Sequence, residues 1–263
     1  MPEPVEGADA ALLSADNLVK RFGGISAVDG MSLQVKRGEI VGLIGPNGAG
    51  KTTMFDLIAG AQSADAGSIR LDGAAIETLA ADRRVALGLG RTFQIPRPFP
   101  TMSVVENVMV GAQAQSGERI WPNWFSMSRV ASEERLNHDK ALELVDFVGL
   151  SHLATEPARV LSGGQRKLLE LARALMADPK ILLLDEPAAG VNPTLLASIV
   201  ERILALNARG MTVLVIEHNM DVVARLCRHV TVMASGRLLA EGTPDEVARD
   251  PQVAEAYLGG LAA

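Results

Sequence analysis

The chain has 263 residues, of which 48% are hydrophobic, 21% charged and 3% aromatic. This length and apolar share are typical of one large folded domain and exclude global disorder. The formal net charge of −6 argues against a nucleic-acid-binding surface, which needs a basic face, so we expect no nucleic acid partner. The single cysteine, Cys227, excludes an internal disulfide and is typical of a protein in the reducing cytoplasm.

The N-terminal residues 1–10 are acidic and rich in proline and glycine, so we expect a disordered lead-in followed by one domain from 11 to 263. No apolar run approaches the roughly 18–20 residues that a membrane-spanning helix needs. Any membrane role must therefore come through a partner.

Short strand candidates alternate with turns in the first part of the chain. The strands are expected at residues 17–22, 31–35 and 40–44, with glycine-containing turns between them. Residues 51–59 are expected to form a helix. Residues 68–71 with Asp72-Gly73 indicate half of a hairpin.

A mostly helical lobe is expected between about 95 and 178, inserted into an α/β body. Residues 95–100 contain three prolines and predict an irregular loop, and residues 117–128, which hold Trp121 and Trp124, predict another. Helices are expected at 104–112, 131–148 and 168–176. In the second of these, the apolar face is expected from Leu136, Leu142, Val145 and Val148.

The last part of the chain alternates apolar runs with helical patterns. Continuous apolar runs at 181–184 and 213–216 are typical of parallel strands that are buried on both faces, and a helix is expected between them at 195–206. This βαβ pattern predicts an α/β fold with a parallel sheet. A hairpin of 230–233 with 238–240 and short helices at 244–248 and 253–258 should close the chain.

A glycine-rich motif follows the apolar run at 40–44 and precedes the expected helix at 51–59. It reads Gly45-Pro46-Asn47-Gly48-Ala49-Gly50-Lys51-Thr52. Glycines let the backbone turn sharply, and inward N–H groups together with a helix N-terminus form a cradle for anions. In this pattern the lysine reaches the β- and γ-phosphates of a nucleotide and the hydroxyl can ligate Mg²⁺. We therefore expect bound ATP and Mg²⁺ rather than a plain glycine-rich turn.

Two acidic residues, Asp185 and Glu186, end the apolar run at 181–184. Because ligands bind at the carboxyl ends of strands in a parallel sheet, both acids should lie beside the phosphate loop. Asp185 is then the candidate Mg²⁺ ligand, and Glu186 is placed to orient or deprotonate the attacking water. The alternative is a pair of solvated acids at a strand end.

The motif Leu161-Ser162-Gly163-Gly164-Gln165 precedes another expected helix. Ser162 can cap that helix, and the two glycines leave backbone N–H groups free, which makes a second anion-binding helix start. An ordinary N-cap is the alternative interpretation. Because one phosphate loop already holds the triphosphate, we expect this motif to close over the nucleotide of another subunit.

The order of these three motifs, with His218 after a later strand, resembles the ATP-binding subunits of ABC transporters. The resemblance covers the chain from about Asp16 to Leu258. It implies a P-loop NTPase fold with a RecA-like core, an antiparallel β subdomain and a helical subdomain. It also implies that two copies sandwich two ATP molecules head to tail, so that binding and hydrolysis close and open the pair.

The resemblance implies roles for single residues. Gln94 would touch Mg²⁺ and water where the core meets the helical lobe, His218 would contact the γ-phosphate, and Phe22 would stack on adenine unless it is a core residue. The implied catalytic set is Glu186, His218 and Gln94, and the implied metal set is Thr52, Gln94 and Asp185. The implied nucleotide-contacting set is Phe22, Gly45, Pro46, Asn47, Gly48, Ala49, Gly50, Lys51, Thr52, Thr53, Ser162, Gly163, Gly164 and Gln165. Asn192 stands where the family usually has Asp, which leaves its cross-subunit role open.

The chain also resembles the branched-chain amino acid importers, a narrower group. The residues that carry this likeness are Arg91-Thr92-Phe93-Gln94, residues 101–108, residues 185–193 and Glu217-His218-Asn219-Met220. The likeness implies a sister ATPase in a homo- or heterodimer, two permease subunits and a periplasmic solute-binding protein. It places the chain in the cytoplasm, peripheral on the inner face of the membrane.

Alternative functions are the lipopolysaccharide-export ATPase, whose motifs are similar, and a non-transport ABC ATPase acting on nucleic acid. The latter usually carries long coiled-coil insertions or two ATPase halves, and the sequence has neither. The proline-rich loop at 95–100, which exposes Phe99, is expected to line the permease-docking groove unless it is simply a stiff solvent loop. Trp121 and Trp124 either contact a partner or pin the lobe. The arginine pairs Arg83-Arg84 and Arg225 with Arg228 are expected on solvated helix faces.

Overall fold

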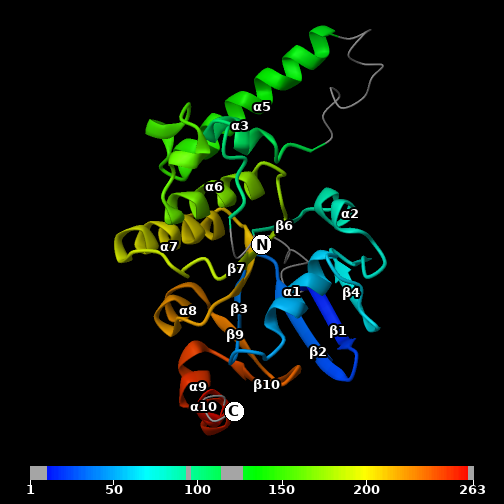
Figure 1. The fold of residues 1–263 in the computed structure, drawn as a ribbon. Helices are drawn as coiled ribbons and strands as arrows, with labels where there is room; N and C mark the ends of the chain where they lie inside the picture. The colour runs from blue at the N-terminus through cyan, green and yellow to red at the C-terminus, as the bar shows by residue number, and fades with distance from the viewer. Residues whose placement is uncertain (1–10, 93–95, 114–126, 260–263) are drawn as a thin grey trace, which may run out of the picture.

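The structure is a computed structural model that describes residues 11–92, 96–113 and 127–259 (Figure 1). Gln94, Trp121, Trp124 and the expected lead-in at 1–10 lie outside the described residues. Within those described ranges, no helix has both the length and the apolar character that a bilayer span requires.

A six-stranded sheet forms the core, in the order β10-β9-β3-β8-β7-β6. The five strands from β9 to β6 in this order are parallel to one another, and β10 pairs antiparallel with β9. The strands are β3 (Ile40–Ile44), β6 (Leu89–Arg91), β7 (Ile181–Asp185), β8 (Thr212–Ile216), β9 (His229–Ala234) and β10 (Arg237–Gly242). The three apolar strands β3, β7 and β8 are buried along their whole length, as parallel strands covered on both faces must be.

A second, antiparallel sheet has the order β2-β1-β4-β5. Its strands are β1 (Ala11–Phe22), β2 (Ile25–Lys36), β4 (Ala66–Leu71) and β5 (Ala74–Ala75). β1 and β2 are longer than the predicted 17–22 and 31–35. The register of β1 shifts between Ala15 and Leu18, where Asn17 has a φ of 50°, so a bulge interrupts the alternation that marks a strand in sequence.

The helices fall into groups that Figure 1 separates. The upper, helical part of the view holds α3 (Val104–Met109), α5 (Met127–Phe147) and α6 (Gly163–Leu175), together with the short 3₁₀ helices η2 (Ser151–Leu153) and η3 (Ala158–Val160). α1 (Lys51–Ala59) lies beside β1 and β2. The remaining helices are α2 (Ala81–Ala86), α7 (Pro193–Ala208), α8 (Met220–Leu226), α9 (Pro244–Arg249) and α10 (Pro251–Gly259).

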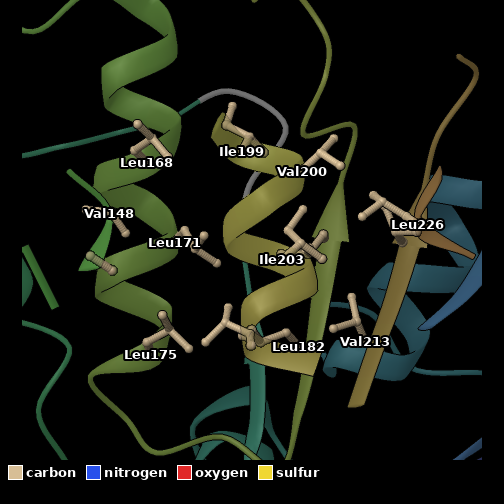
Figure 2. Close-up of a cluster of buried hydrophobic side chains, with 14 of the residues drawn as sticks. Val148, Leu168, Leu171, Leu175, Leu182, Ile199, Val200, Ile203, Val213 and Leu226 are labelled. Carbon is tan, nitrogen blue, oxygen red and sulfur yellow. The ribbon is translucent and has the colours of Figure 1, made fainter. Parts of the chain in front are cut away.

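Two apolar cores cover the two faces of the main sheet. Alternate residues such as Val41 and Leu183 pack with α1 and the antiparallel sheet in one core. Their neighbours, such as Leu182 and Val213, pack with α6, α7 and α8 in the other. Figure 2 shows this second core, with Leu168, Leu171 and Leu175 facing Ile199 and Ile203. The predicted α/β architecture, with an antiparallel sheet and a helical part beside a parallel core, is confirmed.

The predicted apolar face of α5 was half wrong. Leu136 and Leu142 are exposed, with 66% and 39% of their surfaces accessible, whereas Ala141, Val145 and Val148 are buried. The buried positions follow the 3- and 4-residue spacing of a helix face, and the small Ala141 belongs to that face. The prediction named the large residues Leu136 and Leu142, whereas the small Ala141 is the one that is buried.

Arg84 was predicted on a solvated face, and this was wrong. Its side chain is 1% exposed. It donates to the carbonyl oxygens of Leu57 and Ile58 at 2.6 and 2.8 Å, and also to those of Glu77 and Leu79. The last carbonyls of a helix lack the usual partners four residues on. At the end of α1 the N–H of Gly60 reaches the carbonyl of Leu57 at 3.3 Å, and Arg84 supplies donors to those of Leu57 and Ile58. Its neighbour Arg83 is exposed, and so are Arg225 and Arg228, as predicted.

Candidate functional site

Parallel strands end at one edge of the main sheet, and the sequence motifs gather there. β3 leads into the loop at Gly45, β7 ends in Asp185 and Glu186, and β8 leads into Glu217 and His218. β3 pairs with β8, and β8 pairs with β7, so the three connections are neighbours. This edge is where an open α/β sheet binds its ligand.

The glycine-rich loop holds its shape through backbone conformations that favour glycine. Gly45, Gly48 and Gly50 have φ values of 149°, 78° and 100°. A Cβ at Gly45 would lie 2.0 Å from the carbonyl oxygen of Met233, and one at Gly50 would lie 2.2 Å from that of Ala27. A Cβ at Gly48 would meet nothing within 4 Å. The loop is therefore packed tightly on β9 and β2 while the side at Gly48 stays open for a ligand.

Lys51 folds back over this loop. Its amine donates to the carbonyl oxygens of Gly45 and Pro46 at 2.7 and 2.9 Å, and only 8% of the residue is exposed. Burial lowers the pKa of Lys51, while the nearby carboxylates of Glu186 and Asp185 oppose that shift. A buried cation of this kind gains from an anionic ligand.

The other residues of the predicted nucleotide set differ in exposure. Asn47 and Thr52 are exposed, Thr53 is half-buried, and Ala49 is buried. Gly50 stands at the N-cap of α1 and supplies no side-chain acceptor, so the first N–H groups of α1 are capped by no side chain from that position.

Asp185 is a buried carboxylate, with 3% exposure. Among the residues that the structure describes, neither of its oxygens has a hydrogen-bond partner, and the guanidinium of Arg91 lies 3.6 Å away. Arg91 makes a closer contact, 2.7 Å, with Asp56. Burial raises the pKa of Asp185, Arg91 opposes the shift, and Glu186 adds to it. The site thus contains a carboxylate that a further cation would stabilise.

Glu186 and His218 lie close together although they come from different strands. Nδ1 of His218 is 3.8 Å from Oε1 of Glu186. Glu186 has a φ of 46°, and its backbone N–H donates to the carbonyl of Ile216 at 3.0 Å. The amine of Lys167, on α6, donates to the backbone carbonyl of Glu186 at 2.6 Å. The predicted base and the predicted γ-phosphate contact are therefore neighbours.

The motif Leu161–Gln165 begins α6, in the helical part of the molecule. Ser162 and Gln165 form a reciprocal capping box, in which Ser162 N–H donates to Oε1 of Gln165 at 2.9 Å. A Cβ at Gly164 would lie 2.1 Å from Leu195, so that glycine permits α6 to pack on α7. At Gly163 a Cβ would meet nothing within 4 Å. Figure 1 draws α6 and α1 in different halves of the molecule, so the two anion-binding motifs belong to different parts of it.

Phe22 ends β1 and is not a core residue, since 47% of its surface is exposed. The amine of Lys20 lies 5.6 Å from the centre of its ring. Asn192 is the N-cap of α7, where its side chain accepts the N–H of Leu195 at 2.9 Å. Asn therefore serves the local capping role at least as well as Asp would.

The described part of the proline-rich loop, from residue 96, is held against α3 and α6. Asn107, which is fully buried, accepts the N–H of Phe99 at 2.8 Å and donates to its carbonyl at 3.0 Å. Glu170 accepts the N–H of Arg97 at 3.2 Å. The guanidinium of Arg173 lies 5.5 Å from the ring centre of Phe99. This loop is irregular, as predicted, but fixed by side chains, and Phe99 remains 45% exposed.

Two residues of the site were missed in the sequence. Lys167 follows the Leu161–Gln165 motif on α6, and Glu217 precedes His218. Glu217 is fully buried and Lys167 contacts Glu186. The available signal was their position: each is a charged residue beside a predicted functional motif.

Known proteins resemble this chain along almost its whole length. The family described as ABC transporter matches residues 28–189, and the one described as branched-chain amino acid ATP-binding cassette transporter matches residues 237–263. The chain belongs to the ABC transporter ATP-binding family. As such it is an ATP hydrolase coupled to transport, and it is a nucleotide-binding subunit.

Two relatives with similar identity to this chain belong to different transport systems. A probable branched-chain amino acid transport ATP-binding protein, LivG, of Archaeoglobus fulgidus is 41% identical over 248 residues, which are 94% of this chain and 95% of the relative. The lipopolysaccharide export system ATP-binding protein LptB of Escherichia coli is 39% identical over 249 residues, 95% of this chain and 98% of the relative.

Two solved structures are similar in fold. The ADP conformation of an ATP-binding cassette from an ABC transporter has a TM-score of 0.83 and 39% identity, covering 95% of this chain and 99% of that one. A dimeric ATP-binding cassette in a post-hydrolysis state, bound to ADP and Pi, has a TM-score of 0.73 and 26% identity, covering 88% and 98%.

Proposed function

We propose that this ABC ATPase energises the import of branched-chain amino acids or similar small polar solutes. The observation that carries the proposal is the C-terminal match at residues 237–263, because it concerns the branched-chain amino acid group specifically and lies outside the general ATPase motifs. The LivG relative supports it over 94% of the chain.

The site residues take the roles that their positions favour. Lys51 and the N–H groups of the loop at 45–50 bind the phosphates, and Thr53 follows them on α1. Glu186 accepts a proton from, or orients, the attacking water, and His218 contacts the γ-phosphate. Gln94, which lies outside the described residues, is included in this set from its place in the sequence, and Phe22 offers an exposed ring for the adenine. Position, burial and the 3.8 Å approach of His218 to Glu186 support these roles.

Mg²⁺ fits the residues present. Asp185 offers two buried oxygens that have no hydrogen-bond partner in the described part of the chain, and Thr52 offers an exposed hydroxyl at the start of α1. Oxygen donors of this kind, with phosphate oxygens, are what Mg²⁺ prefers. We propose Asp185, Thr52 and Gln94 as its protein donors. When bound, the ion neutralises charge on the β- and γ-phosphates.

We propose that the complete site needs a second subunit. Ser162, Gly163, Gly164 and Gln165 form the start of α6, and a helix N-terminus favours anions. Figure 1 draws α6 in a different part of the molecule from α1, which follows the phosphate loop. Open space at Gly163 leaves room for an approaching partner. A head-to-tail pair, homo- or heterodimeric, would place this motif over the partner's nucleotide. A solved cassette that is 26% identical is described as dimeric and bound to ADP and Pi, which supports pairing.

We also propose the partners and the place of the assembly. Phe99 is exposed on a loop that α3 and α6 hold rigid, which suits a docking contact with one of two permease subunits. A periplasmic solute-binding protein would act through those permeases. The chain would lie on the cytoplasmic face of the membrane without crossing it, with 11–263 as one ATPase domain and about 95–178 as its helical subdomain.

One alternative is supported by a specific observation. The LptB relative is 39% identical and covers the chain as fully as LivG does, so an exporter of lipopolysaccharide type remains the second candidate. The two functions differ in what stimulates the ATPase.

The deciding experiment uses the assembled transporter. The chain is reconstituted with its permease subunits in lipid vesicles, and ATP hydrolysis is measured with a binding protein loaded with leucine, with the same protein unloaded, and with lipopolysaccharide. Import predicts stimulation by the loaded binding protein alone. Stimulation by lipopolysaccharide, with no response to any loaded binding protein, would favour the exporter and reject the import proposal.

A further inference from the structure

Glu217 is a buried carboxylate that no role described above requires. It follows β8 directly and is 0% exposed. Its Oε1 accepts the N–H of Ala188 at 2.7 Å. Its Oε2 accepts the N–H groups of His218 and Asn219 at 3.2 and 3.4 Å. A carboxylate is costly to bury unless it is hydrogen-bonded, and here both oxygens are.

These bonds join two different connections of the main sheet. Ala188 belongs to the segment that follows β7 and carries Glu186. His218 belongs to the segment that follows β8. Outside the strands themselves, the carboxylate of Glu217 fixes the backbone of one segment relative to the other. The two side chains held in this way are those whose Oε1 and Nδ1 lie 3.8 Å apart.

The need to satisfy these backbone N–H groups does not by itself explain why a carboxylate stands at position 217. His218 is 57% exposed at its side chain and Asn219 is half-buried, so water reaches this end of the strand and can satisfy N–H groups there. A threonine or serine hydroxyl has one oxygen with two lone pairs, fewer than the three N–H groups that Glu217 accepts. The two oxygens of the Glu217 carboxylate divide these N–H groups between the two segments: Oε1 accepts that of Ala188, and Oε2 accepts those of His218 and Asn219.

We propose that Glu217 is a positioning residue for hydrolysis, which sets the distance between Glu186 and His218 by clamping the segments that carry them. This inference rests on the roles proposed above for Glu186 and His218. Glu217 itself touches neither substrate nor metal. Catalysis depends steeply on such placement, because a misplacement of about 1 Å can cost on the order of 100-fold in rate.

The test compares Glu217→Gln with wild type. Glutamine has nearly the same shape, but its amide NH₂ group faces N–H donors and breaks one half of the clamp. We expect the turnover number for ATP to fall about 10- to 100-fold, while the Kd for ATP, measured in EDTA-free buffer with Mg²⁺, stays within about threefold. Glu217→Asp keeps both oxygens on a shorter stem and should lose less. The control is Glu77→Gln, which removes a carboxylate that accepts the N–H of Ile69 far from this edge of the sheet.

A double-mutant cycle separates positioning from simple loss of stability. If Glu217 acts through His218, then His218→Ala with Glu217→Gln should lose little more turnover than His218→Ala alone. Multiplicative losses in the double variant would overturn the proposal, and so would an unchanged turnover number per folded molecule in Glu217→Gln. If that variant does not fold, Glu217→Asp carries the same cycle.

The variant Glu186→Gln distinguishes a failure of the proposed role of Glu186 from a failure of the proposed role of Glu217. If Glu186→Gln hydrolyses ATP at a near-normal rate, the proposed role of Glu186 is rejected, and the positioning role of Glu217, which rests on it, is rejected too. If Glu186→Gln is nearly inactive while Glu217→Gln turns over like wild type, only the positioning role of Glu217 fails.

Discussion

The amine of Lys167 donates a 2.6 Å hydrogen bond to the backbone carbonyl of Glu186. Lys167 lies on α6, the helix that Ser162 caps, and Glu186 follows β7 in the core. Burial lowers the pKa of Lys167, and the carboxylates of Glu217, Glu186 and Asp185 oppose that shift. One side chain thus joins the proposed partner-facing motif to the proposed catalytic segment within the same subunit.

Removing this link should slow hydrolysis without preventing ATP binding. Lys167→Met keeps the length of the apolar stem but loses the donor, so the segment at Glu186 is less firmly placed relative to α6. We expect turnover to fall on the order of tenfold, with the Kd for ATP unchanged, in steady-state ATPase and equilibrium-binding assays. Lys140→Met, which removes a lysine paired with Asp178 away from this site, serves as the control. Equal turnover in both variants would contradict a role for the link.

The buried carboxyl of Asp185 should destabilise the protein at neutral pH when Mg²⁺ and nucleotide are absent. Its pKa is raised above the ordinary 3.8, so the folded state holds the proton more tightly than the unfolded state does. Stability from this group is present below pH 3.8 and is lost as pH rises through the folded-state pKa. In EDTA, Asp185→Asn should therefore melt above wild type at pH 7, by about 1–3 °C.

Calorimetry over a pH series checks the sign of this effect. The advantage of Asp185→Asn should shrink as the pH approaches 4 and should reverse when Mg²⁺ and ATP are added, because only the wild type gains from the cation. A variant that melts below wild type in EDTA at pH 7 would show that the carboxylate is already well compensated by Arg91.

Arg84 should stabilise the fold, because its side chain is buried and hydrogen-bonded. Arg84→Ala removes the side-chain donor to the carbonyls of Leu57 and Ile58 at the end of α1 and opens a cavity beneath α2. The carbonyl of Leu57 then keeps only the N–H of Gly60, at 3.3 Å. We expect the free energy of unfolding to fall by about 2–4 kcal/mol in urea titrations. Arg83→Ala, next to it and exposed, should stay within about 0.5 kcal/mol of wild type. Similar losses in the two variants would contradict the assigned capping role.

The exposed ring of Phe99 should be needed for assembly and not for folding. Phe99→Asp places a charge on a loop that Asn107 and Glu170 keep in place. We expect the variant to bind ATP normally but to be lost from the permeases when membranes are solubilised and the complex is captured through a permease tag. Leu136→Asp, on the exposed face of α5, is the matched control. Recovery of Phe99→Asp in the complex at the wild-type level would reject the docking contact.

The fold and the local motifs were largely predictable because each has a local signal. The apolar runs of β7 and β8 mark buried parallel strands, and the glycine pattern of residues 45–52 marks the phosphate loop. The short β6 and α2 were missed. β6 has only three residues, and α2 begins after Ala80 without the capping side chain that marks the equally short α3 and α9.

Long-range contacts explain the remaining errors. Nothing beside Arg84 in the sequence reveals that α1 ends against it, because its acceptors at Leu57 and Ile58 lie 27 and 26 positions away. Likewise, Glu217 became significant only when Ala188, 29 positions away, was found on its carboxylate. Charged residues beside motifs are visible in a sequence, but their partners are set by the packing of the whole sheet.

The central claim is that the phosphate loop of one subunit is completed by Ser162 of another. Its most direct test mixes two inactive variants, Lys51→Ala and Ser162→Arg, at concentrations where wild-type activity per molecule no longer rises. Ser162 is exposed, so arginine there is compatible with folding and blocks the partner's site. A mixed pair contains one site with an intact loop and an intact motif. We predict that the mixture hydrolyses ATP although each variant alone does not; a mixture as inactive as its components would contradict the composite site.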